Sequence, residues 1–409
     1  MDGLSLLDRL SEKRCWEEFC EYKSSLACPK AFCRELRAFI DGRAYLPVCE
    51  AIARGESFPL PKKSVISKQG SQKKRTVYTY PRAENIVLKL LTHLLLRKYD
   101  ALFCEGLYSF RPGRTAKDAI RRLMRTPGIR RMYAYKVDVS NYFNSVPVGR
   151  LLPMLQEALR DDPALFAFLR GLLAEPLALE NGVPVTEEKG IMAGTPLSAF
   201  YANLYLSGLD RSFARERIPY ARYSDDMIVF AESREKIEAY AGRIRAYLSE
   251  AGLAVNPAKE QFSAPAAGWT FLGFSVREGR VDIAPATLDK LKGKMRRKAR
   301  ALQRWRKRNG LSGEKAAAAF LRVFNRKLFE CPADNALSWS LWFFPVINTT
   351  ESLGEIDAYA QDCLRWLIGG TRTKARYNVR YGDLKALGYR SLVHEYYAFA
   401  KGEKPTASG

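Results

Sequence analysis

The stretch ARYSDDMIVFA, residues 221–231, places two adjacent aspartates, Asp225 and Asp226, between two short runs of β-prone residues. A desolvated charge is costly unless a partner compensates for it, and two neighbouring carboxylates also repel each other. The segment therefore predicts a strand, a turn that carries both aspartates, and a second strand. Two explanations remain open: a solvated turn closed by an Asx-type hydrogen bond, or a site for a divalent cation.

A third aspartate follows another predicted strand. The segment RMYAYKVDVSNYF alternates in the manner of a strand, and this strand ends at Asp138. If the two strand regions are neighbours in one sheet, three carboxylates converge, and they remain ionised together only beside cations. Two oxygen-ligated divalent ions suit such a site and catalyse in-line phosphoryl displacement. Each aspartate alone is better explained as a solvated turn, but the three together favour a metal centre.

The charge balance indicates the kind of partner. The 409-residue chain has 67 Lys and Arg against 44 Asp and Glu, a net charge of +23. This excess favours nucleic acid, with an anionic membrane surface as the second possibility. No apolar run is long enough to span a bilayer, and the N-terminus shows no signal-peptide core. We therefore expect a cytoplasmic protein without a membrane partner.

Predicted strands and helices interleave, which indicates an α/β or α+β fold. Residues 1–56 show helical periodicity, and the character of the chain changes again at Pro285. Eleven Lys or Arg residues lie between Lys290 and Arg308 with no acidic residue among them. A helix of this charge tracks a phosphate backbone.

The motifs around these aspartates resemble a known family. KVDVSNYF and YSDD resemble polymerase motifs A and C of bacterial reverse transcriptases. Four further segments resemble family motifs in the same order: SFRPGRTAKDAI, GIMAGTPLSAFYANLYL, GLAVNPAKEQF and WTFLGF. The resemblance implies a right-hand polymerase that makes cDNA from an RNA template. The implied parts are a helical N-terminal region (1–56), fingers and palm (57–284), a basic helical thumb (285–330), a helical C-terminal domain (331–402) and a disordered tail (403–409).

The resemblance also implies a catalytic centre. Asp138 and Asp225 match the ligands of two Mg²⁺ ions, with Asp226 as a supporting ligand and the carbonyl of Val139 completing one shell. Mn²⁺ is the alternative metal. Lys259 matches the lysine proposed to protonate the leaving pyrophosphate.

Nucleotide-binding roles follow in the same way. Phe143 matches the steric gate that excludes a 2′-hydroxyl, although an aromatic at this corner is also typical of a core. Arg75 matches the residue that clamps the triphosphate of the dNTP, with Lys63 assisting, and a solvated charge is the alternative for Lys63. Ala193 and Gly194 occupy the motif B loop, and Ala193 replaces the usual glutamine.

Nucleic-acid contacts are implied at three places. Arg111 and Gly113 match the block that lines the template path. Four residues of the primer-grip hairpin are expected to support the primer end, with packing as the alternative for the aromatics: Trp269, Phe271, Leu272 and Gly273. Four arginines of the thumb are expected to bind the backbone: Arg296, Arg297, Arg300 and Arg304.

The C-terminal segment KARYNVRYGDLKALGYRSLVHEYY resembles the ends of compact reverse transcriptases of anti-phage defence. Such enzymes use a structured non-coding RNA as template and scaffold, and the basic, aromatic segment suits RNA recognition. A mobile-element reverse transcriptase and a non-catalytic RNA-binding splicing factor remain the alternatives. The DNA primer and the oligomeric state stay open.

Overall fold

The computed structural model describes residues 5–26, 28–67, 74–187, 190–330 and 338–402. The tail predicted for residues 403–409 lies outside them. The chain forms two compact units, each described here by itself. Unit 1 comprises residues 1–25 and 31–267, and unit 2 comprises residues 26–30 and 268–409. Both contain helices and strands, which confirms the predicted α+β class.

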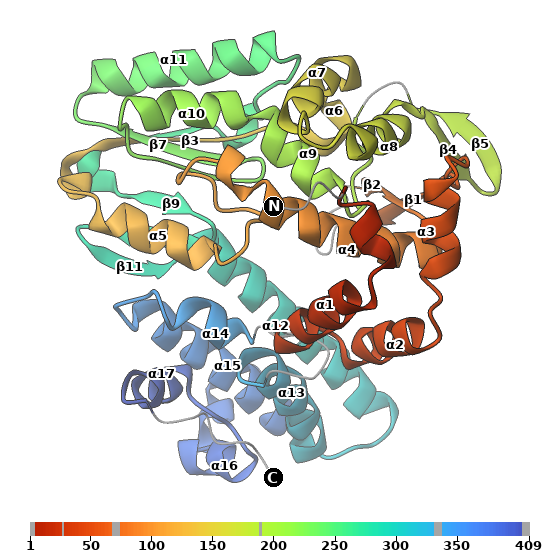
Figure 1. The fold of residues 1–409 in the computed structure, drawn as a ribbon. Coiled ribbons are helices and arrows are strands. Elements are labelled where there is room, and N and C mark those ends of the chain that lie inside the picture. The colour runs from red at the N-terminus through yellow and green to blue at the C-terminus, as the bar shows by residue number, and fades with distance from the viewer. Residues whose placement is uncertain (1–4, 27, 68–73, 188–189, 331–337, 403–409) are drawn as a thin grey trace. The chain divides into compact units, whose positions relative to one another are not determined.

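A four-stranded sheet with the order β6-β7-β3-β8 carries the aspartates of unit 1. Its strands are β3 (Tyr133–Asp138), β6 (Tyr220–Tyr223), β7 (Asp226–Ala231) and β8 (Gln261–Ser263). The predicted strand that ends at Asp138 and the predicted hairpin around residues 224–225 are both confirmed. Strand β7 lies beside β3 with α11 (Arg234–Glu250) packed along both strands (Figure 1). The central strand β7 is buried from Met227 onward, which explains its uninterrupted apolar sequence.

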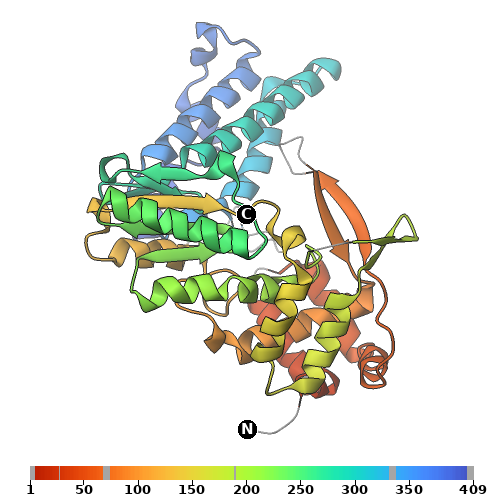
Figure 2. The ribbon, with the colours of Figure 1, turned by 90° about the horizontal axis from the view of Figure 1, so that it is seen from above.

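A second sheet of unit 1 has the order β2-β1-β4-β5. Its strands are β1 (Lys62–Ser67), β2 (Lys74–Thr79), β4 (Leu177–Glu180) and β5 (Val183–Thr186). In Figure 2 the antiparallel β1–β2 hairpin extends beyond the neighbouring helices. The β4–β5 hairpin was missed because its strands have only four residues each and Pro184 interrupts the pattern.

Helices pack around these sheets and build most of the core of unit 1. The N-terminal region is helical as predicted, with Trp16 and Phe19 fully buried. The helical segment after the motif B loop is divided in two, α9 and α10. The helices of unit 1 are α1 (Lys13–Ser25), α2 (Lys30–Asp41, which begins in unit 2), α3 (Leu46–Ala53), α4 (Arg82–Lys98), α5 (Ala116–Arg125), α6 (Tyr142–Ser145), α7 (Val148–Ala158), α8 (Pro163–Ala174), α9 (Ser198–Tyr205), α10 (Ser207–Arg215) and α11, with short 3₁₀ turns η1 to η5 (Asp8–Ser11, Asp100–Leu102, Ile129–Arg131, Pro257–Lys259, Pro265–Ala267).

Unit 2 joins a small antiparallel sheet to a helical bundle. The sheet has the order β11-β10-β9, where the sequence predicted only a pair of strands. Its bounds are β9 (Trp269–Phe271), β10 (Phe274–Arg277) and β11 (Arg280–Ile283). The predicted basic helix is confirmed as α12 (Pro285–Arg308), which packs against α13 (Gly313–Leu328) and α15 (Glu351–Gly369). The remaining helices are α14 (Trp339–Phe343), α16 (Tyr381–Ala386) and α17 (Leu392–Ala400), with the 3₁₀ turn η6 (Lys374–Asn378).

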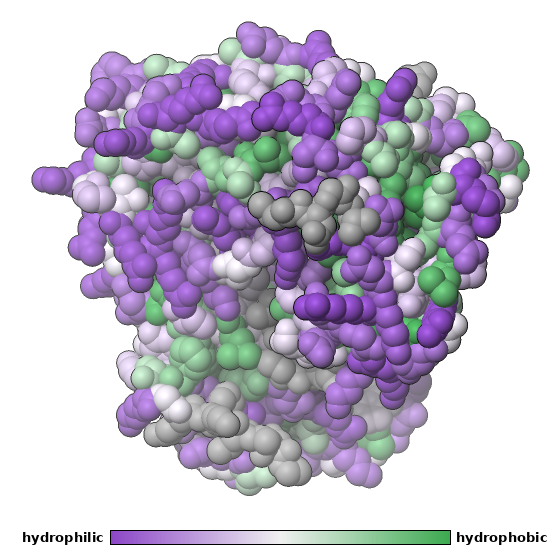
Figure 3. All heavy atoms as spheres, in the orientation of Figure 1, coloured by the Kyte–Doolittle hydropathy of each residue, from purple (hydrophilic) through white to green (hydrophobic). Residues whose placement is uncertain are grey.

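The surface is rich in polar side chains. Hydrophilic residues cover most of the face over α10 and α11 (Figure 3). Among the described residues, no helix combines the length and the apolar character that crossing a bilayer requires.

Candidate active site

The structure brings the three predicted aspartates together at one end of the β3–β7 pair. Asp138 and Asp226 are directly opposite each other in the antiparallel register. Asp225 lies in the β6–β7 turn, and its carbonyl accepts a hydrogen bond of 3.1 Å from the amide of Val139. Asp138 is only 3% exposed. Carboxylates from segments about ninety residues apart in sequence therefore share one partly desolvated corner of the sheet.

The charges of this corner compensate each other only in part. Burial, together with the nearby Asp138 and Asp226, raises the pKa of Asp225 to about 6. The ammonium of Lys259 lies 2.5 Å from a carboxylate oxygen of Asp138. Burial lowers the pKa of Lys259, but the hydrogen bond to Asp138 and the charges of the three aspartates together raise it above its ordinary value. Lys259 thus supplies one positive charge to a site that holds three carboxylates.

The residues of this corner fit divalent metal ions by their chemistry. Oxygen ligands and excess negative charge are what Mg²⁺ and Mn²⁺ require. Nevertheless, no three His, Cys, Asp or Glu side chains among the described residues are arranged as a ready metal cage. The ammonium of Lys259 provides the compensation that a cation would otherwise give to Asp138. Asp138, Asp225 and Asp226 are the side chains that would hold the ions.

One neighbour of Asp138 was missed in the sequence. The backbone amide of Asn256 donates to the carbonyl of Asp138 over 2.8 Å, and its side-chain amide lies 3.4 Å from the carboxylate. The carbonyl of Asn256 in turn accepts from the amide of Lys259. The signal was the Asn-Pro pair of GLAVNPAKEQF, which favours a turn at this point.

A buried ion pair supports the turn that carries Asp225. The guanidinium of Arg222, whose side chain is 0% exposed, donates to Asp210 over 2.8 and 2.5 Å. It also donates to the carbonyls of Ser224 and Asn203. Burial lowers the pKa of Arg222, but Asp210 outweighs it and raises the pKa above its ordinary range. This arginine joins α9, α10 and the β6–β7 turn.

A second set of hydrogen bonds holds the same turn. Ser109 donates through its hydroxyl to the side chain of Asn203 over 3.1 Å, and the amide of Asn203 donates back to the carbonyl of Ser109. The amide of Ser224, whose φ is +59°, donates to the Ser109 hydroxyl over 2.9 Å. Asn203 and Ser109 therefore tie the segment SFRPGRTAKDAI to the YSDD turn.

The motif B loop is packed closely against its neighbours. Ala193 is buried, and its carbonyl accepts from the amide of Tyr78 in β2. A Cβ at Gly194 (φ +101°) would lie 3.1 Å from the carbonyl oxygen of Tyr78. A Cβ at Gly190 (φ +104°) would lie 2.7 Å from the Cα of Asn144. The loop therefore connects β2 of the second sheet to the end of motif A.

Phe143 lies in the short helix α6, which follows the strand that ends at Asp138. It is half-buried and contacts Phe110 edge-on with ring centroids 6.4 Å apart. Its carbonyl accepts a 2.7 Å hydrogen bond from Ile191 of the motif B loop. The backbone is thus fixed while part of the ring remains accessible.

The predicted triphosphate ligands differ in their surroundings. Arg75 is exposed on β2, opposite Ile66 of β1. Lys63 already forms ion pairs within the protein, because its ammonium lies 2.7 Å from Glu187 and 3.5 Å from Glu180. Arg75 is therefore the better candidate for an anion, and Lys63 ties β1 to the β4–β5 region.

Arg111 and the primer-grip aromatics require corrections. The guanidinium of Arg111, 3% exposed, donates to both carboxylate oxygens of Asp100 and to nearby carbonyls. Its guanidinium is therefore engaged inside unit 1 and is not exposed in the way that a template contact was expected to be. Trp269 is 6% exposed and Phe271 0% exposed, so both are core residues of unit 2.

The remaining predicted residues are accessible. Gly113 lies exposed in its loop with φ +67°. Leu272 and Gly273 form the partly exposed turn between β9 and β10, with φ of +51° and +88°. The four thumb arginines are exposed on α12: Arg296, Arg297, Arg300 and Arg304.

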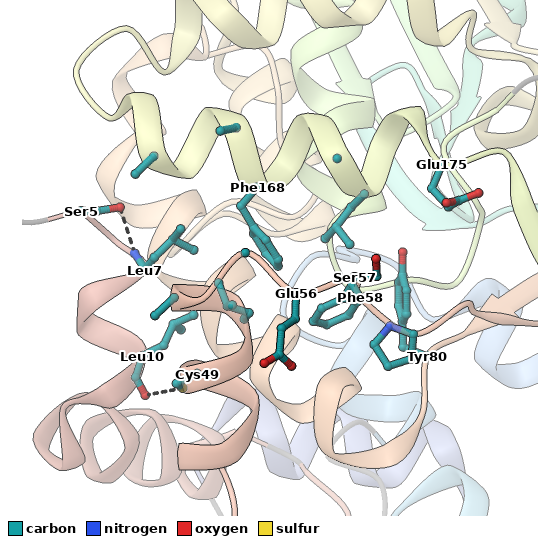
Figure 4. A pocket seen from close by; sticks show the side chains of 18 of the residues that line it. Ser5, Leu7, Leu10, Cys49, Glu56, Ser57, Phe58, Tyr80, Phe168 and Glu175 are labelled. Carbon is teal, nitrogen blue, oxygen red and sulfur yellow. Dashed lines mark hydrogen bonds between the residues drawn. The ribbon is translucent and has the colours of Figure 1, made fainter.

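Unit 1 also contains a cavity of about 750 Å³ among η1, α3, α8 and the segment that precedes β1. Figure 4 shows Phe58, Phe168 and Tyr80 lining it, with Glu56 and Glu175 at its edge. The Cys49 thiol there donates to the carbonyl of Leu10 over 3.3 Å. None of the residues predicted from the sequence lines this cavity.

The chain is similar to known proteins at low sequence identity. The group II intron-encoded protein LtrA of Lactococcus lactis subsp. cremoris is 21% identical over 204 residues, which are 48% of this chain and 33% of LtrA. The same values hold for the protein of strain MG1363. The aligned region thus spans about a third of the length of these curated relatives.

Solved structures with similarity include two telomerases at 12% identity. The apo telomerase of Candida tropicalis has a TM-score of 0.46, with 85% of this chain and 63% of that chain covered. The Candida albicans telomerase in complex with a TWJ fragment of telomeric RNA has a TM-score of 0.42, with coverage of 85% and 64%. The family described as reverse transcriptase (RNA-dependent DNA polymerase) matches residues 60–276, more than half of the chain. The chain therefore belongs to the reverse transcriptase family.

Proposed function

We propose that this protein is an RNA-directed DNA polymerase that copies an RNA template by nucleotidyl transfer. The observation that carries the proposal is the convergence of Asp138, Asp225 and Asp226 at one end of the β3–β7 pair. Burying repelling carboxylates is unfavourable unless a function needs them. A pure RNA-binding splicing factor has no such need, which argues against this alternative.

The roles of the side chains follow from their positions. Two divalent ions, when bound by the three carboxylates, would supply Lewis-acid stabilisation of the transferred phosphoryl group. Lys259 holds a proton at Nζ beside Asp138, and its role in the proposal is to give this proton to the leaving pyrophosphate. Arg75 is exposed and suits the triphosphate of the dNTP. Phe143, which is half-buried, is the proposed steric gate for the sugar of the dNTP.

The parts of a right-hand polymerase are assigned to the chain in the same proposal. Residues 57–284 form fingers and palm, and residues 285–330, which contain α12 and α13, form the thumb. Residues 1–56 and 331–402 are the helical flanking regions. The change from unit 1 to unit 2 falls between Ala267 and Gly268, so the β9–β11 sheet belongs structurally to the unit that carries the thumb.

For the biological role we propose cytoplasmic anti-phage defence with a structured non-coding RNA as template and scaffold. The support is the net charge of +23 and the basic, aromatic C-terminal segment. The second candidate is a mobile-element reverse transcriptase, which the similarity to the intron-encoded LtrA favours. Sequencing the RNA that co-purifies with the protein and the DNA that it synthesises separates them. Intron-derived RNA would contradict the defence role.

The catalytic assignment is tested with Asp225→Asn and Asp138→Ala. Both variants are expected to lose dNTP incorporation on a primed RNA template while RNA affinity is unchanged. Asp225→Asn removes a carboxylate that its neighbours repel, so thermal stability should not fall. Glu238→Gln, which removes an exposed carboxylate of α11, is the matched control and should retain full activity. Near-normal primer extension by Asp225→Asn would refute the role of the aspartates.

A further inference from the structure

A groove between α12 and α13 in unit 2 is not used by the proposed catalytic function. Its volume is about 650 Å³, and both helices line it. Small side chains form its floor: Ala301, Ala318 and Ala319. Trp305, 43% exposed, borders this floor. Since large aromatic side chains are normally buried, an exposed indole beside a shallow groove offers a flat face to a ligand.

Three cations surround the same groove. Lys298 comes from α12, and Lys315 and Arg322 come from α13. Within the described part of the chain, none of the three forms an ion pair with a carboxylate. Their charges are therefore not neutralised internally, and the groove attracts an anion.

The positive charge continues along the helix pair. Lys294 of α12 lies against Lys327 of α13, and burial together with Lys294 lowers the pKa of Lys327 to about 8. The ammonium groups of Lys294 and Lys327 repel each other at this distance, and an anion bound between them would reduce the repulsion. From Lys294 to Trp305 the helix rises about 16 Å, which gives an elongated track.

This track is on a different face of α12 from three of the four thumb arginines, Arg296, Arg300 and Arg304. At about 100° per residue, Lys294, Lys298 and Trp305 fall within a band of about 40°. Arg296, Arg300 and Arg304 form a second stripe whose centre lies about 140° around the helix from the first. The two stripes therefore cannot contact the same side of one ligand.

We infer that the α12–α13 groove binds a single-stranded segment of nucleic acid, with one unstacked base on Trp305 and its phosphates on Lys298, Lys315 and Arg322. A base supplies the flat face that the indole can stack on, and the phosphates supply the charge. A double helix lacks an accessible base face, so the groove favours single strands. The inference rests on the proposed function only in taking nucleic acid as the natural partner.

The test compares two triple variants of the full-length chain that remove equal charge. Both are made in the Asp225→Asn background, so that no synthesis occurs. The groove variant carries Lys298→Gln, Lys315→Gln and Arg322→Gln, and the control carries Arg296→Gln, Arg300→Gln and Arg304→Gln. Fluorescence anisotropy measures their affinities for a labelled oligo(A) RNA and for a blunt RNA duplex over a range of salt concentrations.

We expect the groove variant to lose oligo(A) affinity selectively. Its log–log salt slope should become shallower by about 2, because each phosphate contact to a single strand contributes about 0.7. The control should affect the duplex more than oligo(A). Equal effects of both variants on both RNAs would overturn the groove assignment.

Trp305→Ala tests the stacking separately from the charge. It should weaken oligo(A) binding by roughly 5- to 100-fold without changing the salt slope, whereas Trp305→Phe should keep most of the affinity. Unchanged affinity of Trp305→Ala would refute the inference. If the protein bound anionic vesicles more tightly than oligo(A), and Trp305→Ala weakened that binding, the inference would be overturned and the groove would be a membrane contact. Since no variant is tested for activity, failure here is distinct from failure of the polymerase proposal.

Discussion

Replacing Asp210 with asparagine should strongly destabilise the sheet that carries the catalytic aspartates. The Arg222 and Asp210 side chains are 0% and 1% exposed, so Asp210→Asn leaves the charge of Arg222 buried without its counter-ion. Asparagine keeps an oxygen for the hydroxyl of Tyr220, which donates to Asp210 over 2.9 Å. The change therefore removes mainly charge. Removing one partner of a buried ion pair costs about 3–5 kcal/mol.

Hydrogen exchange at the amides of β6 and β7, followed by mass spectrometry, measures this loss in the full chain. The expected cost corresponds to exchange that is roughly 100- to 5,000-fold faster. Glu238→Gln breaks the exposed pair with Arg234, where the side chains are 55% and 76% exposed, and should change exchange by less than about threefold. The double variant Asp210→Asn/Arg222→Met, which removes both charges and keeps an acceptor for Tyr220, should recover part of the protection. An acceleration below tenfold in Asp210→Asn would refute the reasoning.

Three further changes test other parts of unit 1. Gly190→Ala should lower both thermal stability and the rate of primer extension, because its Cβ would lie 2.7 Å from the Cα of Asn144 at a φ of +104°. Gly242→Ala, on the open face of α11, is the control and should stabilise the protein by about 0.5–1 kcal/mol in urea unfolding. A loss of stability in both variants would contradict the steric argument for Gly190. Phe143→Ala should reduce the preference for dNTPs over rNTPs in single-nucleotide incorporation, and an unchanged preference would make the residue part of the core. Thr115→Ala should cost about 1 kcal/mol in urea unfolding, because it removes the side-chain cap of α5, and a cost near zero would show that the capping box is dispensable.

The sequence alone determined the local elements with strong patterns. The strand that ends at Asp138, the strand pair around Asp225 and the basic helix α12 were all predicted, because apolar alternation and helical periodicity are local properties. The order of motifs also indicated the reverse transcriptase family, and the match over residues 60–276 confirms it.

Only the tertiary structure decided which polar groups are buried and what they contact. Arg111 and the thumb arginines look alike in the sequence, yet Arg111 pairs internally with Asp100 while the arginines of α12 are exposed. The Arg222–Asp210 ion pair could not be recognised in the sequence, because its contribution to stability depends on how α9, α10 and β6 together exclude water from it. Likewise, the contact of Lys259 with Asp138 joins residues 121 positions apart. Desolvation and charge pairing act between segments that folding brings together, and local sequence patterns do not encode them.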